Sequence, residues 1–244
     1  MYELGIVVVI GILIGSFLNV LIIRIPKDES VVFPSSHCVK CGENLKWWHN
    51  IPIFSWIFLQ GKCAFCKDKI SIQYPIVEFA SGVIFALVYF KEGDLTLSFI
   101  VGGVFVLLLA LSMIDFKFKE VPDSLNLLAL SLAIFSSYEL IDNFQNALLF
   151  AGGFTILRFY VSYFVKREAM GEADIIIGAT IGGIIGIKLG LVTIFLSALL
   201  ALPAFLIAGK RDMELPFIPF LAMALFIVYI GDDFFKSLLV SMYG

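Results

Sequence analysis

Long apolar stretches separated by short polar loops dominate the chain. Windows of about 20 apolar residues, the length that crosses a bilayer as a helix, predict eight spans: 4–23, 75–90, 97–114, 124–141, 144–164, 174–187, 189–208 and 215–231. This number depends most on the short sixth span and on the junction at 187–189. The pattern predicts an all-α polytopic membrane protein with about eight transmembrane helices.

The composition supports a membrane protein. Of the 244 residues 60% are hydrophobic and 15% charged, whereas about half of an ordinary soluble domain is apolar. No basic surface interleaved with aromatic residues is apparent, so nucleic acid is not an expected partner. The first span has no Lys or Arg before it and no A-x-A site after it, which predicts a membrane helix rather than a cleavable signal peptide.

Basic residues predict the orientation, because Lys and Arg are retained on the cytoplasmic side. With the N-terminus outside, the inner loops hold 13 basic residues and the outer segments hold three, Lys91, Lys188 and Lys236. Both termini are therefore predicted outside. A group of aromatic residues is interpreted as anchors among the lipid headgroups: Trp47, Trp48, Trp56 and Tyr74.

One long polar segment, 25–73, holds all four cysteines. It divides the chain into a first helix (1–24), a cytoplasmic module (25–73) and a membrane bundle (74–244). Two C-x-x-C pairs, 21 residues apart, predict a tetrahedral structural Zn²⁺ site of Cys38, Cys41, Cys63 and Cys66. A rubredoxin-like iron site and a redox dithiol are the alternatives, while the reducing cytoplasm argues against disulfides. His37 is interpreted as a neighbour of the site rather than a ligand.

Ionisable residues at membrane depth are candidates for function because they are costly there. Asp115 ends the third predicted span and Asp174 begins the sixth, so the topology places both at the inner membrane edge. Two neighbouring carboxylates share a proton, and one activates water while the other polarises a carbonyl. This pair predicts peptide hydrolysis without a covalent intermediate.

Structural interpretations of these residues stay open beside the catalytic one. Asp174 fits an N-cap, Asp115 an interfacial partner of Lys117 or Lys119, and Asp123 an N-cap of the fourth span. Glu78 lies at the same inner level, where it lines a substrate groove or pairs with a base such as Lys69.

Several segments together resemble the type IV prepilin peptidases, which are membrane aspartic proteases that also methylate the new N-terminus. "GILIGSFLNVLIIRIP", the cysteine segment and "IDFKFKEVPD" are similar to segments of that family, and "GEAD" is similar to its G-x-G-D signature. The resemblance implies catalytic roles for Asp115 and Asp174. Three further residues are predicted to line a substrate groove or support the site: Glu78, Gly171 and Asp123. The resemblance also implies S-adenosylmethionine as methyl donor, type IV prepilins or pseudopilins as substrates, and a bacterial inner membrane location.

Ala173 departs from the signature, because a second glycine is expected there. A left-handed backbone at that position would be strained by about 1 kcal/mol or more. Two other classes of function remain as alternatives: an ion-coupled transporter with the aspartates as ion ligands, and a membrane scaffold whose zinc module docks a partner.

Overall fold

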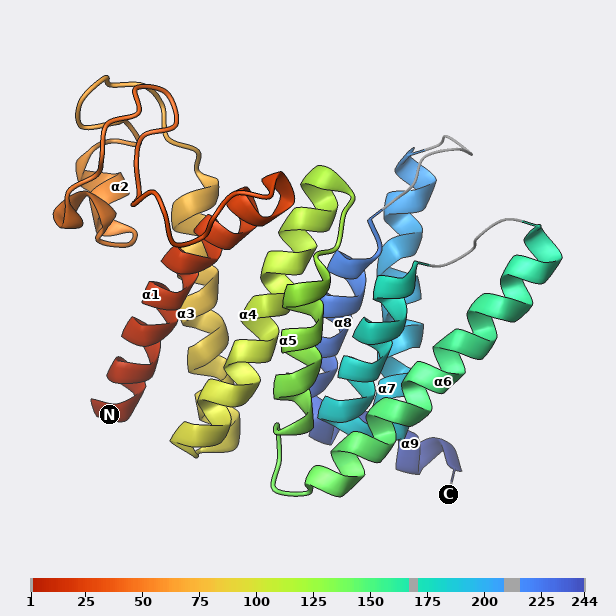
Figure 1. Cartoon of the computed structure of the whole chain (residues 1–244). Helices are drawn as coiled ribbons and strands as arrows, with labels where there is room; N and C mark the ends of the chain where they lie inside the picture. Colours follow the sequence, from red (N-terminus) through yellow and green to blue (C-terminus); the bar gives the residue numbers. More distant parts are fainter. Residues whose placement is uncertain (1, 167–170, 209–215, 244) are drawn as a thin grey trace. The chain divides into compact units, whose positions relative to one another are not determined.

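The structure is a computed structural model that describes residues 2–166, 171–208 and 216–243 (Figure 1). These residues form α-helices and two short 3₁₀ turns: α1 Tyr2–Arg24, η1 Ile25–Lys27, η2 Trp47–Asn50, α2 Phe54–Phe58, α3 Gln73–Glu92, α4 Leu95–Phe118, α5 Asp123–Ile134, α6 Leu140–Val165, α7 Glu172–Ala208, α8 Ile218–Ile230 and α9 Asp232–Tyr243. They make up two compact units, Met1–Gly102 and Gly103–Gly244. Helix α4 begins in the first unit and ends in the second.

In the first unit, α1 packs closely against α3 through glycines. A Cβ atom added at Gly15 would lie 2.8 Å from the backbone of Glu78, and one added at Gly11 would lie 2.8 Å from the ring of Phe85. Small residues of this kind allow helix backbones to approach in a membrane. Between α1 and α3, the side chain of Asn19 donates to the carbonyl oxygen of Tyr74 and accepts from Gln73.

In the second unit, α5, α6 and α8 pack against α7, and α6 leans across α7 in Figure 1. Glycines again set the spacing: an added Cβ at Gly182 would lie 2.6 Å from the carbonyl oxygen of Asn146, and one at Gly178 would lie 2.9 Å from the ring of Phe154. The hydroxyl of Ser136 also donates to the carbonyl oxygen of Gly183, over 3.4 Å.

The eight predicted spans are not confirmed as a number. Among the described residues, five helices are long and apolar enough to cross a membrane, or six if α8 and α9, which are bent by 82°, form one broken span. The predicted sixth and seventh spans lie in one element, α7, interrupted at Gly186 by a non-helical backbone with φ 68° and ψ −175°. Such a conformation is essentially restricted to glycine.

The fourth predicted span, 124–141, is wrong in its extent because α5 ends at Ile134. Polar groups turn the chain there. The side-chain amide of Asn143 donates to the carbonyl oxygen of Ile134 and to the hydroxyl of Ser137. These two hydrogen bonds hold the turn between α5 and α6. At 12 residues, α5 is shorter than the roughly 20 that a perpendicular membrane helix needs.

Candidate active site and metal centre

Asp115 lies near the end of α4 and is 8% exposed. Its Oδ2 atom accepts the backbone N–H of Ile218, the first residue of α8, over 3.2 Å. Asp115 is thus held by an N–H at the start of a helix. The bond joins the end of α4 to the beginning of α8 within the second unit.

Asp174 lies in the first turn of α7, two residues after the helix begins. It is therefore not the N-cap, which corrects that structural interpretation. Its Oδ2 atom accepts the N–H of Gly171, the residue before the helix, over 3.2 Å. This bond resembles the returning half of a capping box, in which the third helical residue bonds the N-cap N–H.

The start of α7 is also held by neighbouring residues. Glu172 forms an ion pair with Arg158 of α6 (3.2 Å). The carbonyl oxygen of Ala173 accepts the side-chain amide of Asn126 from α5 (3.1 Å). Ala173 is helical and does not have positive φ, so the strain considered for an alanine in the signature does not arise.

The two aspartates belong to the same compact unit, the second. The elements that hold them reach the same end of this unit, where α4 finishes and α5, α7 and α8 begin (Figure 1). Two carboxyl groups, each fixed by one backbone N–H, form a candidate acid–base pair.

The three residues predicted to line a groove or support the site have different surroundings. Gly171 is exposed and donates its N–H to Asp174. Asp123 is exposed as the first residue of α5, and Pro122 is the N-cap, so the N-cap interpretation of Asp123 is wrong. Glu78 belongs to the first unit, where its buried carboxylate accepts the N–H of Ile53 (2.7 Å); among the described residues no ion pair joins it to Lys69.

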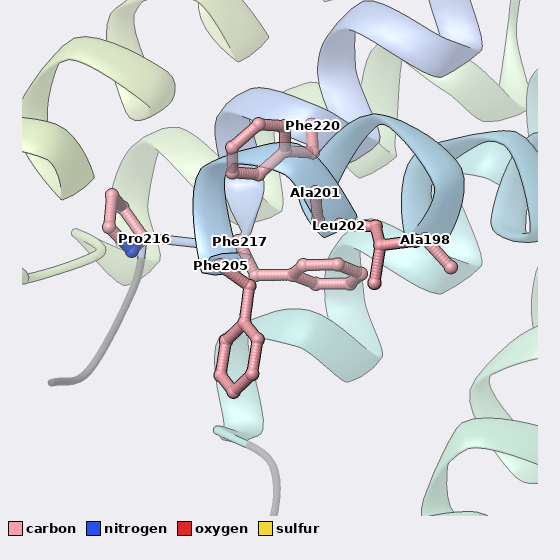
Figure 2. Close-up of a pocket in the computed structure, with 7 residues that line it drawn as sticks. All are labelled: Ala198, Ala201, Leu202, Phe205, Pro216, Phe217 and Phe220. Carbon is pink, nitrogen blue, oxygen red and sulfur yellow. The ribbon is translucent and has the colours of Figure 1, made fainter. Parts of the chain in front are cut away.

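An apolar hollow of about 310 Å³ lies between the C-terminal part of α7 and the start of α8 (Figure 2). Phe217, one of its lining residues, directly precedes Ile218, whose N–H holds Asp115. Among the residues that the structure describes, its lining consists of aliphatic, aromatic and proline side chains: Ala198, Ala201, Leu202, Phe205, Pro216, Phe217 and Phe220. The hollow is suited to apolar groups.

The two cysteine pairs have the same backbone pattern. The N–H of Cys38 donates to the carbonyl oxygen of Glu43, and the N–H of Cys63 donates to that of Asp68. Antiparallel bridges close the two turns, His37 with Asn44 and Lys62 with Lys69. The residue after each second cysteine has positive φ, 72° at Gly42 and 62° at Lys67. The segment is thus built from two similar knuckles.

These knuckles bring the four sulfur atoms to within 4.8 Å of one another. Metal–sulfur bonds of about 2.3 Å in a tetrahedron require sulfur–sulfur edges of about 3.8 Å, and Cys38 and Cys66 lie 3.8 Å apart. All four cysteines are free of disulfides. The backbone N–H groups of Cys41 and Lys40 lower the pKa of Cys38 to about 6, whereas burial and the neighbouring thiols raise the pKa of Cys41 to about 11. Cys38 is thus the member of the pair that favours the thiolate, the form that binds metals. This cluster could hold a metal ion.

His37 is held outside this cluster. Its Nδ1 atom lies 3.0 Å from the carbonyl oxygen of Ser35, which agrees with its interpretation as a neighbour of the site. An ion pair between Lys40 and Asp68 (3.0 Å) joins the two knuckles. Both side chains are exposed, so this pair contributes little to stability.

Sequence reasoning missed Asn126 and the N–H of Ile218. Asn126 had a signal, because it is a polar amide inside an apolar predicted span, but an amide is not ionisable and so does not stand out as a carboxyl group does. The N–H of Ile218 had no signal in the sequence, because every residue except proline carries a backbone N–H and nothing distinguishes this one. Three basic residues used for the orientation, Arg167, Lys210 and Arg211, lie outside the described residues.

Comparison with known proteins supports the family resemblance. Residues 9–92 match the bacterial peptidase A24 N-terminal domain, and residues 102–206 match the type IV leader peptidase family. The prepilin leader peptidase/N-methyltransferase of Neisseria gonorrhoeae is 32% identical, over 92% of this chain and 89% of the relative. The proteins of the same name from Xanthomonas campestris and Bacillus subtilis are 33% and 29% identical, over 92% and 98% of this chain and 90% and 98% of the relatives. No solved structure gives a significant match.

Proposed function

Since the chain belongs to the type IV leader peptidase family, we propose that Asp115 and Asp174 are the catalytic pair of a membrane aspartic endopeptidase. The observation that carries this proposal is their arrangement in the second unit. Two carboxyl groups that are 59 positions apart in the sequence are carried by the end of α4 and the start of α7, which lie at the same end of this unit (Figure 1). Each is fixed by a backbone N–H, from Ile218 or Gly171.

The reaction needs one proton between the two carboxyl groups. The ionised group removes a proton from water, whose oxygen attacks the carbonyl carbon of the scissile peptide bond, while the protonated group donates to the carbonyl oxygen. The carbon–nitrogen bond then breaks as the nitrogen takes up a proton, which gives a carboxylic acid and a new amine. Which aspartate is the base is a property of the coupled pair, because the two titrate together.

The proposed substrates are type IV prepilins or pseudopilins, with a short basic leader followed by an apolar helix. The names of the relatives support this substrate class. The distribution of basic residues supports a site at the cytoplasmic edge of the bacterial inner membrane, with both termini outside. Cleavage would then occur where the basic leader meets the apolar helix.

A second proposed activity is methylation of the amine that cleavage releases, with S-adenosylmethionine as co-substrate. It rests on the names of the relatives, which combine a leader peptidase with an N-methyltransferase. The two reactions form a sequence, because only the cleaved product has the free N-terminus that accepts the methyl group.

Zinc is the metal proposed for the cysteine cluster. Four thiolates leave no open coordination position for a substrate or water, so the ion would fold the module rather than take part in hydrolysis. Iron fits the same tetrahedral set of sulfurs, and metal analysis of the purified protein separates the two. A transporter or scaffold is not favoured, because neither accounts for the match to a peptidase family.

The test is cleavage of a prepilin-like peptide by purified full-length protein, with mass spectrometry of the product. The wild type is expected to cut, and Asp115→Asn and Asp174→Asn are each expected to reduce kcat by at least about 10³-fold. Asp142→Asn is the matched control and is expected to retain activity, because this exposed aspartate in the first turn of α6 has no part in the proposed site. With S-adenosylmethionine present, the new N-terminus should gain about 14 Da, the mass of the added CH₂. Full activity in either dyad variant would contradict the assignment.

A further inference from the structure

The second unit contains a buried side chain beside the aspartate pair that has no role so far. Asn126 lies in the first turns of α5 and is 0% exposed. Its Nδ2 atom donates to the carbonyl oxygen of Ala173 over 3.1 Å. That carbonyl belongs to the peptide bond joining Ala173 to Asp174. Asn126 is therefore hydrogen-bonded to the peptide group that directly precedes the proposed catalytic residue.

This contact fixes the orientation of the amide. A carbonyl oxygen only accepts hydrogen bonds, so the Asn126 atom facing it must be the nitrogen. The other atom, Oδ1, is therefore the one without a partner, and among the described residues it is a buried acceptor that receives no hydrogen bond. Exchanging the nitrogen and oxygen atoms of the Asn126 amide would place two oxygen acceptors against each other, so the assignment is not ambiguous.

An unsatisfied buried acceptor is costly. It lowers stability relative to a satisfied one, and an apolar residue of similar shape avoids that cost. A buried polar atom without a hydrogen bond is expected at positions where the residue serves function rather than stability. A second buried asparagine in the same unit provides a contrast, because Asn143 donates to Ile134 and Ser137 and accepts from Ser137.

We propose that Asn126 is a positioning residue for Asp174, and that it acts by holding the Ala173 carbonyl at the start of α7. Asp174 is the third residue of this helix, so a rotation or shift of the first turn moves its carboxyl group relative to Asp115. Small displacements of catalytic groups lower rates strongly because reaction requires close alignment. The inference rests on the proposed dyad.

The test compares three variants of the full-length protein with wild type and Asp174→Asn in the same peptide-cleavage assay. Asn126→Leu removes both polar atoms at nearly constant shape, and is expected to melt at or above the wild-type temperature while kcat falls at least about ten-fold and KM changes less than about two-fold. Asn143→Leu is the matched control. It is expected to lower the melting temperature, because three hydrogen bonds are lost, and to retain the wild-type kcat at temperatures where it is folded.

Asn126→Asp adds a readout that a structural role would not give. When protonated, the introduced carboxyl group can donate to the Ala173 carbonyl as the amide does; when ionised, it cannot donate and repels that oxygen. The kcat of this variant relative to wild type is therefore expected to fall as the pH rises. A constant ratio across the pH range would contradict the proposal.

The outcomes separate this inference from the dyad itself. Activity of Asn126→Leu at the wild-type kcat, with Asp174→Asn inactive, would overturn the role of Asn126 and leave the dyad intact. Full activity of Asp174→Asn would overturn the dyad, and the inference with it. Parallel losses of kcat and melting temperature in Asn126→Leu and Asn143→Leu would show that Asn126 is only structural.

Discussion

At the scale of single residues, the two cysteine knuckles suggest a stabilising substitution. Gly42 and Lys67 occupy equivalent left-handed positions, φ 72° and 62°, but only glycine adopts this conformation without cost. Lys67→Gly should remove about 1 kcal/mol of strain, and metal affinity should increase several-fold because metal binding and folding of the module are coupled. Chelator competition measures the change.

The reverse substitution is the control for that prediction. A Cβ atom added at Gly42 has nothing within 4 Å, so Gly42→Ala introduces backbone strain without a steric clash. It should weaken metal binding by about the factor that Lys67→Gly gains. Unchanged affinity in both variants would mean that the left-handed turns do not limit folding of the module.

The residues of the site were predictable to different degrees. Carboxyl groups at membrane depth stand out in a hydropathy pattern, so Asp115 and Asp174 could be proposed from sequence. Their surroundings could not. The capping contact of Asp174 depends on where α7 begins, and the bond to Asp115 comes from a backbone N–H 103 residues later. Such pairings are set by tertiary packing, which hydropathy does not encode.

At the scale of helices, close packing of α1 and α3 predicts a position-dependent effect of alanine. Gly15→Ala places a Cβ atom 2.8 Å from the Glu78 backbone, which cannot move like a flexible side chain. We expect a loss of about 1–3 kcal/mol from overpacking, seen as a lower melting temperature in detergent. Gly5→Ala in the same helix meets nothing within 4 Å and should be neutral or slightly stabilising. Equal melting temperatures for the two variants would exclude tight packing at Gly15.

The positions of helices were more predictable than their ends. Every predicted span overlaps a helix, because the apolar windows are long. The end of α5 at Ile134 was missed, since it depends on hydrogen bonds from Asn143 rather than on hydropathy. The junction predicted at 187–189 lies next to the interruption at Gly186, where Lys188 lowers the local hydropathy and glycine permits positive φ.

At the scale of the whole molecule, the cysteine cluster predicts one metal ion per chain. Elemental analysis of purified protein should give zinc close to one equivalent, and Cys63→Ser should lose it because a buried ligand is removed. Removing the ion with a chelator should expose segment 25–73 to protease while the helical circular dichroism of the membrane bundle persists. An equivalent of iron in place of zinc, or protection unchanged without metal, would contradict the structural zinc proposal.

The orientation and the interruption of α7 can be tested together, because they make opposite predictions for two lysines. If α7 crosses the membrane twice, Lys188 lies in an outer turn beside Gly186; if it crosses once, Lys188 lies within the bilayer. If α7 crosses twice, Lys188→Cys should react with a membrane-impermeant maleimide on intact cells. Lys27→Cys, predicted on the cytoplasmic side, should react only after permeabilisation. Both side chains are exposed, so burial in the protein does not explain a difference. Labelling of Lys27→Cys from outside would reverse the orientation, and absence of labelling at Lys188→Cys would favour a single crossing by α7.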